Sequence, residues 1–577
     1  MSLRCWARRI ACAALFVPVA ASAAPWQSET ASAAPHAMVA TEQRYASRVG
    51  VRVLESGGNA VDAAVAVAYA LAVVDPCCGN VGGGGFMVLR MHDGRERFID
   101  FREKAPLRAT RDMYLDASGN PVAERSQKGW LAIGVPGTVL GMETARREYG
   151  TMSRERLMAP AIALARDGFV VGADDLPPFL GSEQELSGGP YDFAHQANVA
   201  AVFLRGGALP KPASRLVQPQ LARTLELIAR DGAGAFYRGP IARAIVNASG
   251  ANGGILSMAD FAAYRVEESA PLHCTYAGYD VASAPPPSSG GVTLCEILNI
   301  LAPYPLAAWG WHGPDETHYL VEAERRAYAD RNAYLGDPDF VTDPVAQLLD
   351  PAYAARLRAT IDARRATPSS QVRPGLDVAI HENGETTHYS IVDEAGNAVA
   401  VTYTLNDWFG AGVIAGDTGF FLNDEMDDFA AKAGTANMYG LVQGARNGVE
   451  PGKRPLSSMA PTVVTKDGKL VMVTGSPGGG RIITIALETI LNALVFGMNA
   501  QQAVDAPRVH MQWLPDEVQY EPGALTPETM DVLRANGYRF RVLDPWGVAQ
   551  VILVDPVTGT RYGGSAHSRP GGAALGY

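Results

Sequence analysis

Hydrophobic residues recur with helical spacing between residues 42 and 72 and predict a helical hairpin. Glycines at 57–58 interrupt the pattern, and Asn59 follows with a side chain that can cap the second helix. Four glycines at 82–85 then allow a tight turn before an apolar strand at 86–89. This glycine run lacks the Gly-Lys-Ser/Thr ending of a phosphate-binding loop, so it predicts a turn rather than a nucleotide site.

The middle of the chain is predicted to be mainly helical. This applies to residues 130–335, where a loop of prolines, serines and glycines at 285–291 must connect elements rather than lie inside one. Residues 362–385 are polar and include prolines, a composition typical of an exposed segment where chains are cut. The character of the chain changes after this segment.

Two β-hairpins are predicted in the last third of the chain. The first covers residues 389–404 with a turn at 394–397, and the second covers residues 462–474. A glycine-rich loop at 475–480 then leads into an apolar helix that begins near Arg481. Such a loop exposes backbone N–H groups and suits an anion or oxyanion, although the same pattern fits a plain strand-to-helix turn.

The N-terminus has the features of a signal peptide. Arginines precede an apolar run at 10–20, and Ala21-Ser22-Ala23 supplies the small residues of a cleavage site. We therefore expect residues 1–23 to be removed on export, with the mature protein periplasmic or secreted.

Composition narrows the classes of partner. The chain has 577 residues, of which 47% are hydrophobic and 19% charged, as in a folded globular protein. Its net charge is −11, so it offers no basic surface for nucleic acid or anionic lipid. After the signal peptide, the longest apolar run, at 60–74, contains Asp62 and is shorter than the ~18–20 residues that span a bilayer. We expect no nucleic-acid partner and no membrane partner.

Neither a disulfide scaffold nor a metal centre is predicted. The mature chain retains Cys77, Cys78, Cys274 and Cys295, too few for a scaffold and without the spacing of a metal site. One disulfide among these four cysteines is possible, but the adjacent Cys77 and Cys78 are expected to pair poorly with each other. The histidines form no HExxH motif and no cluster, so no metal or other cofactor is expected.

Several short segments form a recognisable set of motifs, and in chain order they lie at 100–103, 285–291, 384–390, 402–406, 423–429, 453–459 and 475–479. Together they resemble the motifs of γ-glutamyltransferases (γ-glutamyltranspeptidases), bacterial type, in the N-terminal nucleophile hydrolase superfamily. Agreement in order over nearly the whole mature chain is far more specific than any single segment. The resemblance implies an α+β fold, a four-layer αββα sandwich built as one body from two processed subunits.

The resemblance implies self-cleavage between Glu385 and Thr386. A Thr-Thr pair that opens a strand is, by itself, ordinary β-propensity. A threonine hydroxyl is a poor nucleophile, but cleavage supplies a free N-terminal amine with a pKa of about 7.7–8.0 as its base. Cleavage gives a large subunit, 24–385, and a small subunit, 386–577, that form a heterodimer. Thr404 is expected to support the nucleophile.

The resemblance also implies the remaining site residues. They form the two ends of a pocket for the γ-glutamyl group, an oxyanion-binding site (the oxyanion seat) and a lid. They are Arg102, Ser457 and Ser458 for the α-carboxylate; Asn406, Glu425 and Asp428 for the ammonium; Gly478 and Gly479 for the oxyanion; and Tyr439 for the lid. A guanidinium matches a carboxylate bidentately, which suits Arg102 to this role. Taken alone, Arg102 and Asp428 would fit a surface ion pair equally well.

Some positions depart from the family pattern. Ala433 replaces a proline, Gly480 replaces a serine, and the segment 564–569 lacks an aspartate that the family usually carries there. His388 lies two residues after the predicted nucleophile, and we expect it to be structural rather than a catalytic base.

The function implied is transfer of the γ-glutamyl group of glutathione or related donors to water, amino acids or dipeptides. A glutaryl or cephalosporin acylase of the same fold is the nearest alternative. A periplasmic binding protein that has lost self-cleavage is a second. A serine hydrolase built on Ser288 or Ser476 is disfavoured, because neither serine lies in a G-x-S-x-G motif.

Overall fold

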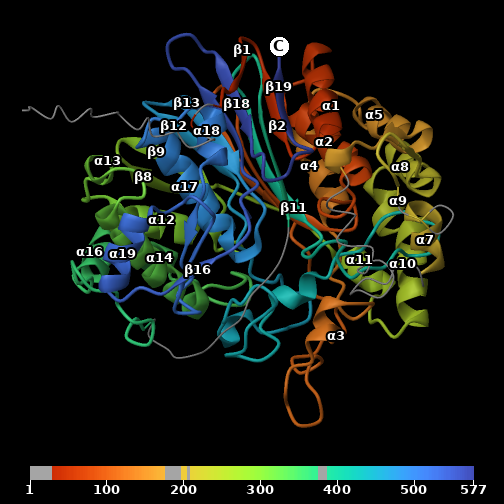
Figure 1. The fold of residues 1–577 in the computed structure, drawn as a ribbon. Coiled ribbons are helices and arrows are strands. Elements are labelled where there is room, and N and C mark those ends of the chain that lie inside the picture. The colour runs from red at the N-terminus through yellow and green to blue at the C-terminus, as the bar shows by residue number, and fades with distance from the viewer. Residues whose placement is uncertain (1–26, 28, 176–195, 205–207, 209, 374–385) are drawn as a thin grey trace, which may run out of the picture.

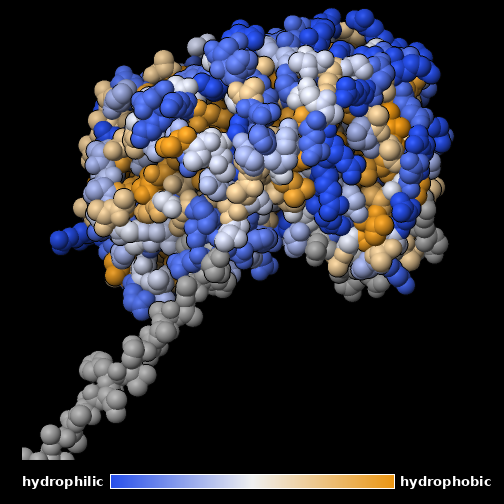
Figure 2. Space-filling model, turned by 90° about the horizontal axis from the view of Figure 1, so that it is seen from above, coloured by the Kyte–Doolittle hydropathy of each residue, from blue (hydrophilic) through white to orange (hydrophobic). Residues whose placement is uncertain are grey.

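The computed structural model describes residues 27, 29–175, 196–204, 208, 210–373 and 386–577. The predicted signal peptide at 1–23 and the predicted cleavage residue Glu385 lie outside these residues. None of the described helices is long and apolar enough to cross a membrane. The surface seen from above is a mixture of hydrophilic and scattered hydrophobic residues (Figure 2).

Two seven-stranded sheets lie face to face in the middle of the molecule (Figure 1). The first has the order β1 (Ser32–Ala34), β18 (Arg561–Ser565), β17 (Gln550–Val554), β13 (Lys469–Gly475), β12 (Thr462–Lys466), β9 (Tyr279–Ser283) and β8 (Leu272–Tyr276). The second has the order β19 (Ala573–Gly576), β2 (Met38–Thr41), β10 (Thr387–Val392), β11 (Ala398–Thr404), β3 (Gly84–Arg90), β4 (Glu96–Asp100) and β7 (Glu267–Ser269). Both sheets combine strands from before and after residue 386.

The two predicted hairpins are confirmed. Strands β10 and β11 pair antiparallel with Thr387 opposite Tyr403, and β12 and β13 pair with Thr462 opposite Thr474. In the second sheet β10 is paired on both edges, by β2 and by β11. The segment that follows Thr386 is therefore an interior strand held from both sides.

Apolar side chains fill the space between the sheets. Phe86 and Val88 of β3 meet Val463, Val473 and Ile552 of the opposite sheet there. Alternate residues of the same strands point outward to the helices. Strands covered on both faces read as continuous apolar runs, which explains the sequence of β3.

Helices cover the outer face of each sheet, so the predicted four-layer αββα sandwich is confirmed (Figure 1). Those beside the second sheet are α1 (Arg44–Glu55), α2 (Ala60–Val74), α4 (Thr138–Tyr149), α5 (Arg154–Asp167), α7 (Ala197–Phe203), α8 (Pro219–Asp231), α9 (Ala233–Tyr237), α10 (Pro240–Ala251) and α11 (Met258–Ala263), with α3 (Ala123–Gln127) below them. Those beside the first are α12 (Gly290–Leu301), α13 (Leu306–Trp309), α14 (Pro314–Tyr334), α15 (Val345–Leu348), α16 (Pro351–Arg358), α17 (Ile482–Leu494), α18 (Ala500–Asp505) and α19 (Pro527–Ala535).

The predicted helical hairpin is the pair α1 and α2. Asn59 caps α2, and its side chain accepts a hydrogen bond from the Asp62 N–H while the Asp62 carboxylate accepts one from the Asn59 N–H. Every residue of α2 is buried. Its uninterrupted apolar sequence therefore reflects a core position between the sheet and the outer helices.

The expectation that residues 130–335 are mainly helical overlooked strands. Strands β7 and β8 are edge strands of the two main sheets, β9 lies between β8 and β12, and β5 (Phe169–Val170) pairs with β6 (Arg215–Leu216). Ala277 and Gly278 have φ of 50° and 81° and close the β8–β9 hairpin. Short edge strands carry little periodicity, so the turn was their main sequence signal. A three-stranded sheet, β14 (Val509–His510), β15 (Val518–Tyr520) and β16 (Phe540–Val542), was also not predicted.

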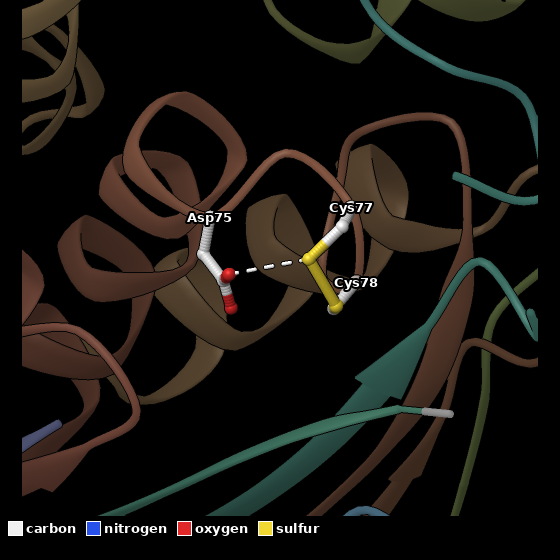
Figure 3. Close-up of side chains that lie close together, drawn as sticks. All are labelled: Asp75, Cys77 and Cys78. Atoms are coloured by element: carbon white, nitrogen blue, oxygen red, sulfur yellow. Dashed lines mark hydrogen bonds between the residues drawn. A yellow bond between two sulfur atoms is a disulfide. The ribbon is translucent and has the colours of Figure 1, made fainter. Parts of the chain in front are cut away.

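Two disulfides occur in the part of the chain that the structure describes, Cys77–Cys78 and Cys274–Cys295. The expectation that adjacent Cys77 and Cys78 would pair poorly was wrong. The turn that follows α2 brings both sulfurs to the same side of the chain (Figure 3). The second bridge ties β8 to α12.

Candidate active site

The predicted nucleophile lies directly before β10, inside the molecule. Thr386 is buried, and the Thr404 hydroxyl at the end of β11 donates a hydrogen bond to Thr386 Oγ1 over 3.3 Å. The pairing of β10 with β11 brings the two threonines together, because Thr387 lies opposite Tyr403. Thr404 Oγ1 also accepts the N–H of Asn406 at 2.8 Å, which fixes its orientation.

A small cavity opens beside Thr386. Its volume of ≈ 10 Å³ leaves room for about one water molecule. The residues that line it are Arg102, Thr386, Thr404, Asn406, Glu425, Asp428, Tyr439, Ser457, Ser458, Met459, Gly479 and Ile482. The structure thus gathers nearly all of the predicted site residues from distant parts of the chain. Gly478 lies next to this set without lining it, and Met459 and Ile482 were not predicted.

One side of the cavity is a buried ion-pair cluster. Arg102 follows β4, and its two terminal nitrogens donate to Glu425 and Asp428, which lie in a 3₁₀ turn. Arg102 Nε donates to the Pro455 carbonyl at 3.2 Å. Burial raises the pKa of both carboxyl groups, and Arg102 opposes that shift. Burial alone would lower the pKa of Arg102, but the two acids raise it above its ordinary value.

The predicted serines lie beyond Arg102. Ser458 Oγ accepts a hydrogen bond from Arg331 at 2.8 Å, and Ser457 Oγ accepts one from the Met459 N–H at 3.1 Å. Arg331 of α14 is a second buried cation close to the cavity, and burial lowers its pKa to about 10. Sequence reasoning missed Arg331, since nothing in its local pattern distinguishes it from the other charged residues of α14.

Tyr439 closes the cavity. Its hydroxyl donates to the Asn406 carbonyl at 2.8 Å and lies against Asn406 Oδ1. Its ring packs over Gly479, where an added Cβ would lie 2.4 Å from Tyr439 Cδ1. Gly479 also has a φ of 54°, so both space and backbone conformation require glycine there. The predicted lid residue therefore contacts both the ammonium end and the predicted oxyanion seat.

His388 points away from the cavity into the space between the sheets. Its Nδ1 lies 2.8 Å from Thr402 Oγ1, and its Nε2 lies 3.1 Å from Ser390 Oγ. Burial lowers its pKa to about 3, so the ring is neutral at ordinary pH. These contacts fit the structural role expected for it.

One group of possible metal ligands occurs among the described residues. It comprises Asp75, Cys77 and Cys78, and the disulfide already engages both sulfurs. Thiolates rather than disulfide sulfurs are the metal ligands of cysteine, so this group does not suit a metal in its oxidised form.

Two stacked sheets between helical layers are the fold of the N-terminal nucleophile hydrolases. The chain belongs to the γ-glutamyltranspeptidase family, because the family model "Gamma-glutamyltranspeptidase" matches residues 46–577. It is therefore an enzyme of that family.

Individual relatives agree with this assignment. The "Glutathione hydrolase proenzyme" of Pseudomonas sp. (strain A14) is 53% identical, over 98% of this chain and 97% of the relative. The protein of the same name from Escherichia coli (strain K12) is 49% identical, over 92% of this chain and 90% of the relative. The crystal structure of a cephalosporin acylase from Bacillus halodurans has a TM-score of 0.82 and 27% identity, and the match covers 98% of this chain and 99% of that one.

Proposed function

We propose that this chain is a glutathione hydrolase and γ-glutamyltransferase that cuts itself before Thr386 and then uses Thr386 as its nucleophile. The observation that carries the proposal is the hydrogen bond between Thr404 and Thr386 at the edge of the cavity lined by Arg102, Glu425 and Asp428. The names of its relatives, glutathione hydrolase proenzymes, support both the donor and the processing.

The charges of the cavity match the two ends of a γ-glutamyl group. Its α-carboxylate can pair with Arg102, and its ammonium with Glu425, Asp428 and Asn406. Within the protein Arg102 already pairs with both acids, so the ligand would exchange one set of ion pairs for another. Such an exchange limits the net cost of burying the charges of the ligand. Ser457 and Ser458 lie beside Arg102 as further donors to the carboxylate.

The same atoms would serve self-cleavage and turnover. In self-cleavage, Thr386 Oγ1 attacks the Glu385 carbonyl, the amide becomes an ester, and water releases it. The new amine of Thr386 then acts as base, because its ordinary pKa of about 7.7–8.0 keeps part of it neutral near pH 7. In turnover, the hydroxyl attacks the γ-glutamyl carbonyl, forms an ester, and releases cysteinylglycine from glutathione.

Completion of turnover requires an oxyanion seat and an acceptor. The N–H groups of Gly478 and Gly479 are proposed to bind the oxyanion, and removal of one such donor typically costs about 10²–10³ in rate. Water resolves the ester in hydrolysis, and an amino acid or dipeptide amine resolves it in transfer. We further propose that the large and small subunits remain together as a heterodimer in the periplasm or the medium.

Denaturing electrophoresis and N-terminal sequencing test the proposal directly. The exported wild type should give two fragments, with the smaller one starting at Thr386 and the larger one near residue 24. Thr386→Ala should give a single chain without γ-glutamyl hydrolysis. A fragment that starts at another residue would refute the assignment of the nucleophile.

An acylase of the same fold is the second candidate, favoured by the structural match to a cephalosporin acylase. Glutaryl side chains lack the α-amine, so they leave no ligand for the buried carboxylates Glu425 and Asp428. Uncompensated buried charges are costly, which favours the γ-glutamyl donor. Comparing the hydrolysis of γ-glutamyl and glutaryl anilides decides between them, and a glutaryl preference would overturn our first choice.

A further inference from the structure

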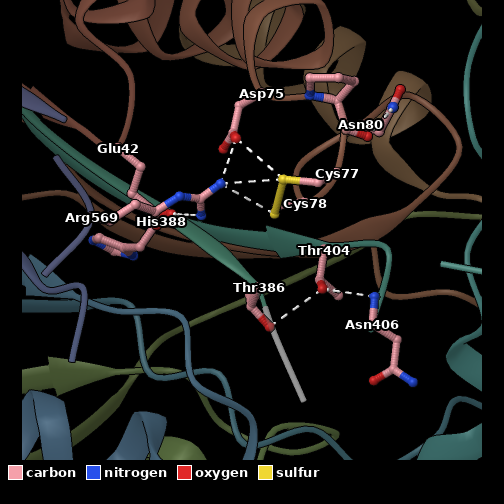
Figure 4. The surroundings of a disulfide bond; sticks show 11 residues. Glu42, Asp75, Cys77, Cys78, Asn80, Thr386, His388, Thr404, Asn406 and Arg569 are labelled. Carbon is pink, nitrogen blue, oxygen red and sulfur yellow. Dashed lines mark hydrogen bonds and ion pairs between the residues drawn. A yellow bond between two sulfur atoms is a disulfide. The ribbon is translucent and has the colours of Figure 1, made fainter. Parts of the chain in front are cut away.

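A second polar cluster, made of Asp75, Cys77, Cys78 and Arg569, lies above the strand that Thr386 precedes in the view of Figure 4. Its centre is the Cys77–Cys78 disulfide, which is completely buried. Arg569 Nη2 lies 3.2 Å from Cys77 Sγ and 3.4 Å from Cys78 Sγ. The same nitrogen donates to Asp75 Oδ1 at 2.5 Å. The disulfide is therefore in contact with a buried ion pair.

Arg569 links this cluster to strand β10. Its other terminal nitrogen donates to Glu42 Oε2, and Glu42 Oε1 accepts the N–H of His388 at 2.7 Å. His388 lies two residues after Thr386. A continuous chain of polar contacts thus runs from the sulfurs to the backbone that carries the nucleophile.

The cysteine loop also contacts the active-site strands directly. The Cys77 carbonyl accepts the N–H of Phe409 at 2.8 Å, three residues after Asn406. At Gly79 an added Cβ would lie 2.4 Å from Thr387 Cγ2, so the loop packs against the residue that follows the nucleophile. A shift of this loop would therefore reach both the start of β10 and the end of β11.

The surroundings of the sulfurs suit thiol chemistry. Cys77 Sγ lies 3.3 Å from Asp75 Oδ1, and Asp75 Oδ2 is buried without a hydrogen-bond partner among the described residues. A reduced Cys77 would supply an S–H donor to this carboxyl group. Burial raises the pKa of Asp75, so it can also hold a proton for a departing thiolate. The Arg569 cation favours that thiolate.

We propose that the Cys77–Cys78 pair is a redox modification site for small thiols, and that its disulfide form keeps the nucleophile strand in its catalytic arrangement. Because both sulfurs are buried, the exchange takes place when the cysteine loop opens locally. The thiolate of one small thiol then attacks one sulfur of the pair, forms a mixed disulfide and releases the other sulfur as a thiolate, which takes up a proton. The thiolate of a second small thiol attacks the outer sulfur of the mixed disulfide, and the bond to the protein sulfur breaks. That protein sulfur leaves as a thiolate and takes up a proton, while the two small thiols depart together as a disulfide. The pair gains two electrons and two protons, and the two small thiols lose them.

Reduction should disturb the site through packing. Two thiols cannot stay at bonding distance, and their surroundings are closed, with Cys77 and Cys78 at 0% and 1% exposure. The loop must therefore move relative to Thr387 and Phe409. Misplacement of a reacting group by ~1 Å costs about 10²-fold in rate. Glutathione, the donor in the proposed function, belongs to the class of thiols that would carry out the reduction.

The test compares oxidised and reduced mature protein. Protein purified in air is incubated with dithiothreitol or left untreated, then assayed with γ-glutamyl-p-nitroanilide, which is not a thiol. Alkylation and mass spectrometry measure the reduced fraction of the peptide that contains residues 77–78. We expect kcat to fall about 10- to 100-fold in proportion to that fraction, and to recover when the peptide is reoxidised.

Two cysteine pairs provide matched controls. Cys274→Ala with Cys295→Ala should keep the response, and Cys77→Ala with Cys78→Ala should make kcat equal with and without reductant. An unchanged kcat in wild type whose 77–78 peptide is fully reduced would overturn the proposal. Free thiols at 77 and 78 in air-purified protein would also overturn it. If the Cys77/Cys78 variant does not fold, the correlation in wild type still decides.

A readout independent of activity separates this inference from the proposed function on which its assay rests. Hydrogen exchange of the peptide over residues 386–392 should accelerate when the 77–78 peptide is reduced, and unchanged exchange would count against the coupling. An oxidised protein without γ-glutamyl activity would refute the proposed function, whereas hydrogen exchange would still decide the redox inference.

Discussion

Asp428→Asn tests how the pocket recognises the ammonium of its donor. Asp428 accepts hydrogen bonds from Arg102 through Oδ2 and from Asn437 Nδ2, at 3.2 Å, through Oδ1. Asn437 cannot turn its amide over, because its Oδ1 accepts the N–H groups of Tyr439 and Leu441 at 3.0 and 3.2 Å. The substituted amide keeps its oxygen toward Arg102 and loses the bond to Asn437. The change removes one negative charge with almost no change in volume.

The expected loss has two parts. A hydrogen bond to a charged group contributes about 1.5–3 kcal/mol, and a neutral one about 0.5–1.5 kcal/mol. Since each 1.4 kcal/mol is a factor of ten, the lost charge should lower kcat/KM for a γ-glutamyl donor by about 10- to 150-fold. The lost Asn437 contact weakens the lid for every substrate alike.

Comparing two chromogenic substrates separates these parts. For γ-glutamyl-p-nitroanilide the variant should lose both contributions, and for glutaryl-p-nitroanilide, which lacks the amine, only the smaller one. The ratio of kcat/KM for the two substrates should therefore fall by the full 10- to 150-fold. Asn437→Ala is the control for the lid, and it should lower both substrates equally. A ratio unchanged in Asp428→Asn would refute Asp428 as a ligand of the ammonium.

Four further predictions follow from single features of the structure. Thr404→Val removes the donor to Thr386 and the acceptor of the Asn406 N–H. At roughly 1 kcal/mol per hydrogen bond, the rate of self-cleavage and kcat should each fall about 30-fold. Thr404→Ser keeps the hydroxyl, so its self-cleavage on denaturing gels and its kcat should stay close to those of the wild type. Gly479→Ala forces a φ of 54° on a residue with a Cβ that would meet Tyr439 at 2.4 Å, so kcat/KM should fall at least 5- to 30-fold from about 1–2 kcal/mol of backbone strain. Gly480→Ala, whose Cβ would meet its nearest atom at 3.1 Å, is the matched control, and equal losses would contradict this account. Burial lowers the pKa of His388 to about 3, below the ~6.5 of an unfolded histidine. The unfolded state therefore binds an additional proton between pH ~6.5 and 3, and the free energy of unfolding falls over that range by up to about 1.4 kcal/mol per pH unit. Acid unfolding followed by circular dichroism should be less steep for His388→Gln over that window. Cys274→Ala with Cys295→Ala opens a link between residues 21 apart and should lower the urea unfolding free energy by about 3 kcal/mol with kcat unchanged; a loss of activity would show that this bridge acts on the site.

The elements that the sequence predicted best are those whose burial is uniform along their length. Helix α2 is almost entirely apolar because all of it is buried. Strands β10 and β11 are buried along their whole length, because helices cover one face and the opposite sheet covers the other. The β8–β9 hairpin lies at a sheet edge and has exposed positions, so its pattern is too short and too mixed to outweigh the surrounding helices.

The sequence predicted most of the residues that line the cavity beside Thr386, but not how these residues contact one another. Matching motifs identified Arg102, Glu425 and Asp428, yet their pairing with one another depends on long-range packing that no local pattern encodes. Arg331 was missed for the same reason, since its contact with Ser458 joins α14 to a segment 127 residues away. The Cys77–Cys78 bridge was judged from the general geometry of adjacent cysteines, whereas the turn after α2 decides it.

The position of β10 is compatible with the proposal that Thr386 serves both cleavage and catalysis. Strand β10 pairs with β2 on one edge and β11 on the other, through Tyr389 opposite Thr41 and opposite Val401. These pairings begin at Thr387 and Tyr389, so cleavage before Thr386 would remove no described strand from either sheet. The new amine is therefore expected to stay beside Thr404 instead of swinging away. The proposed cleavage would assign β2, β3 and β4 to the large subunit, so the same hydrogen bonds that hold Thr386 in place should also hold the two subunits together.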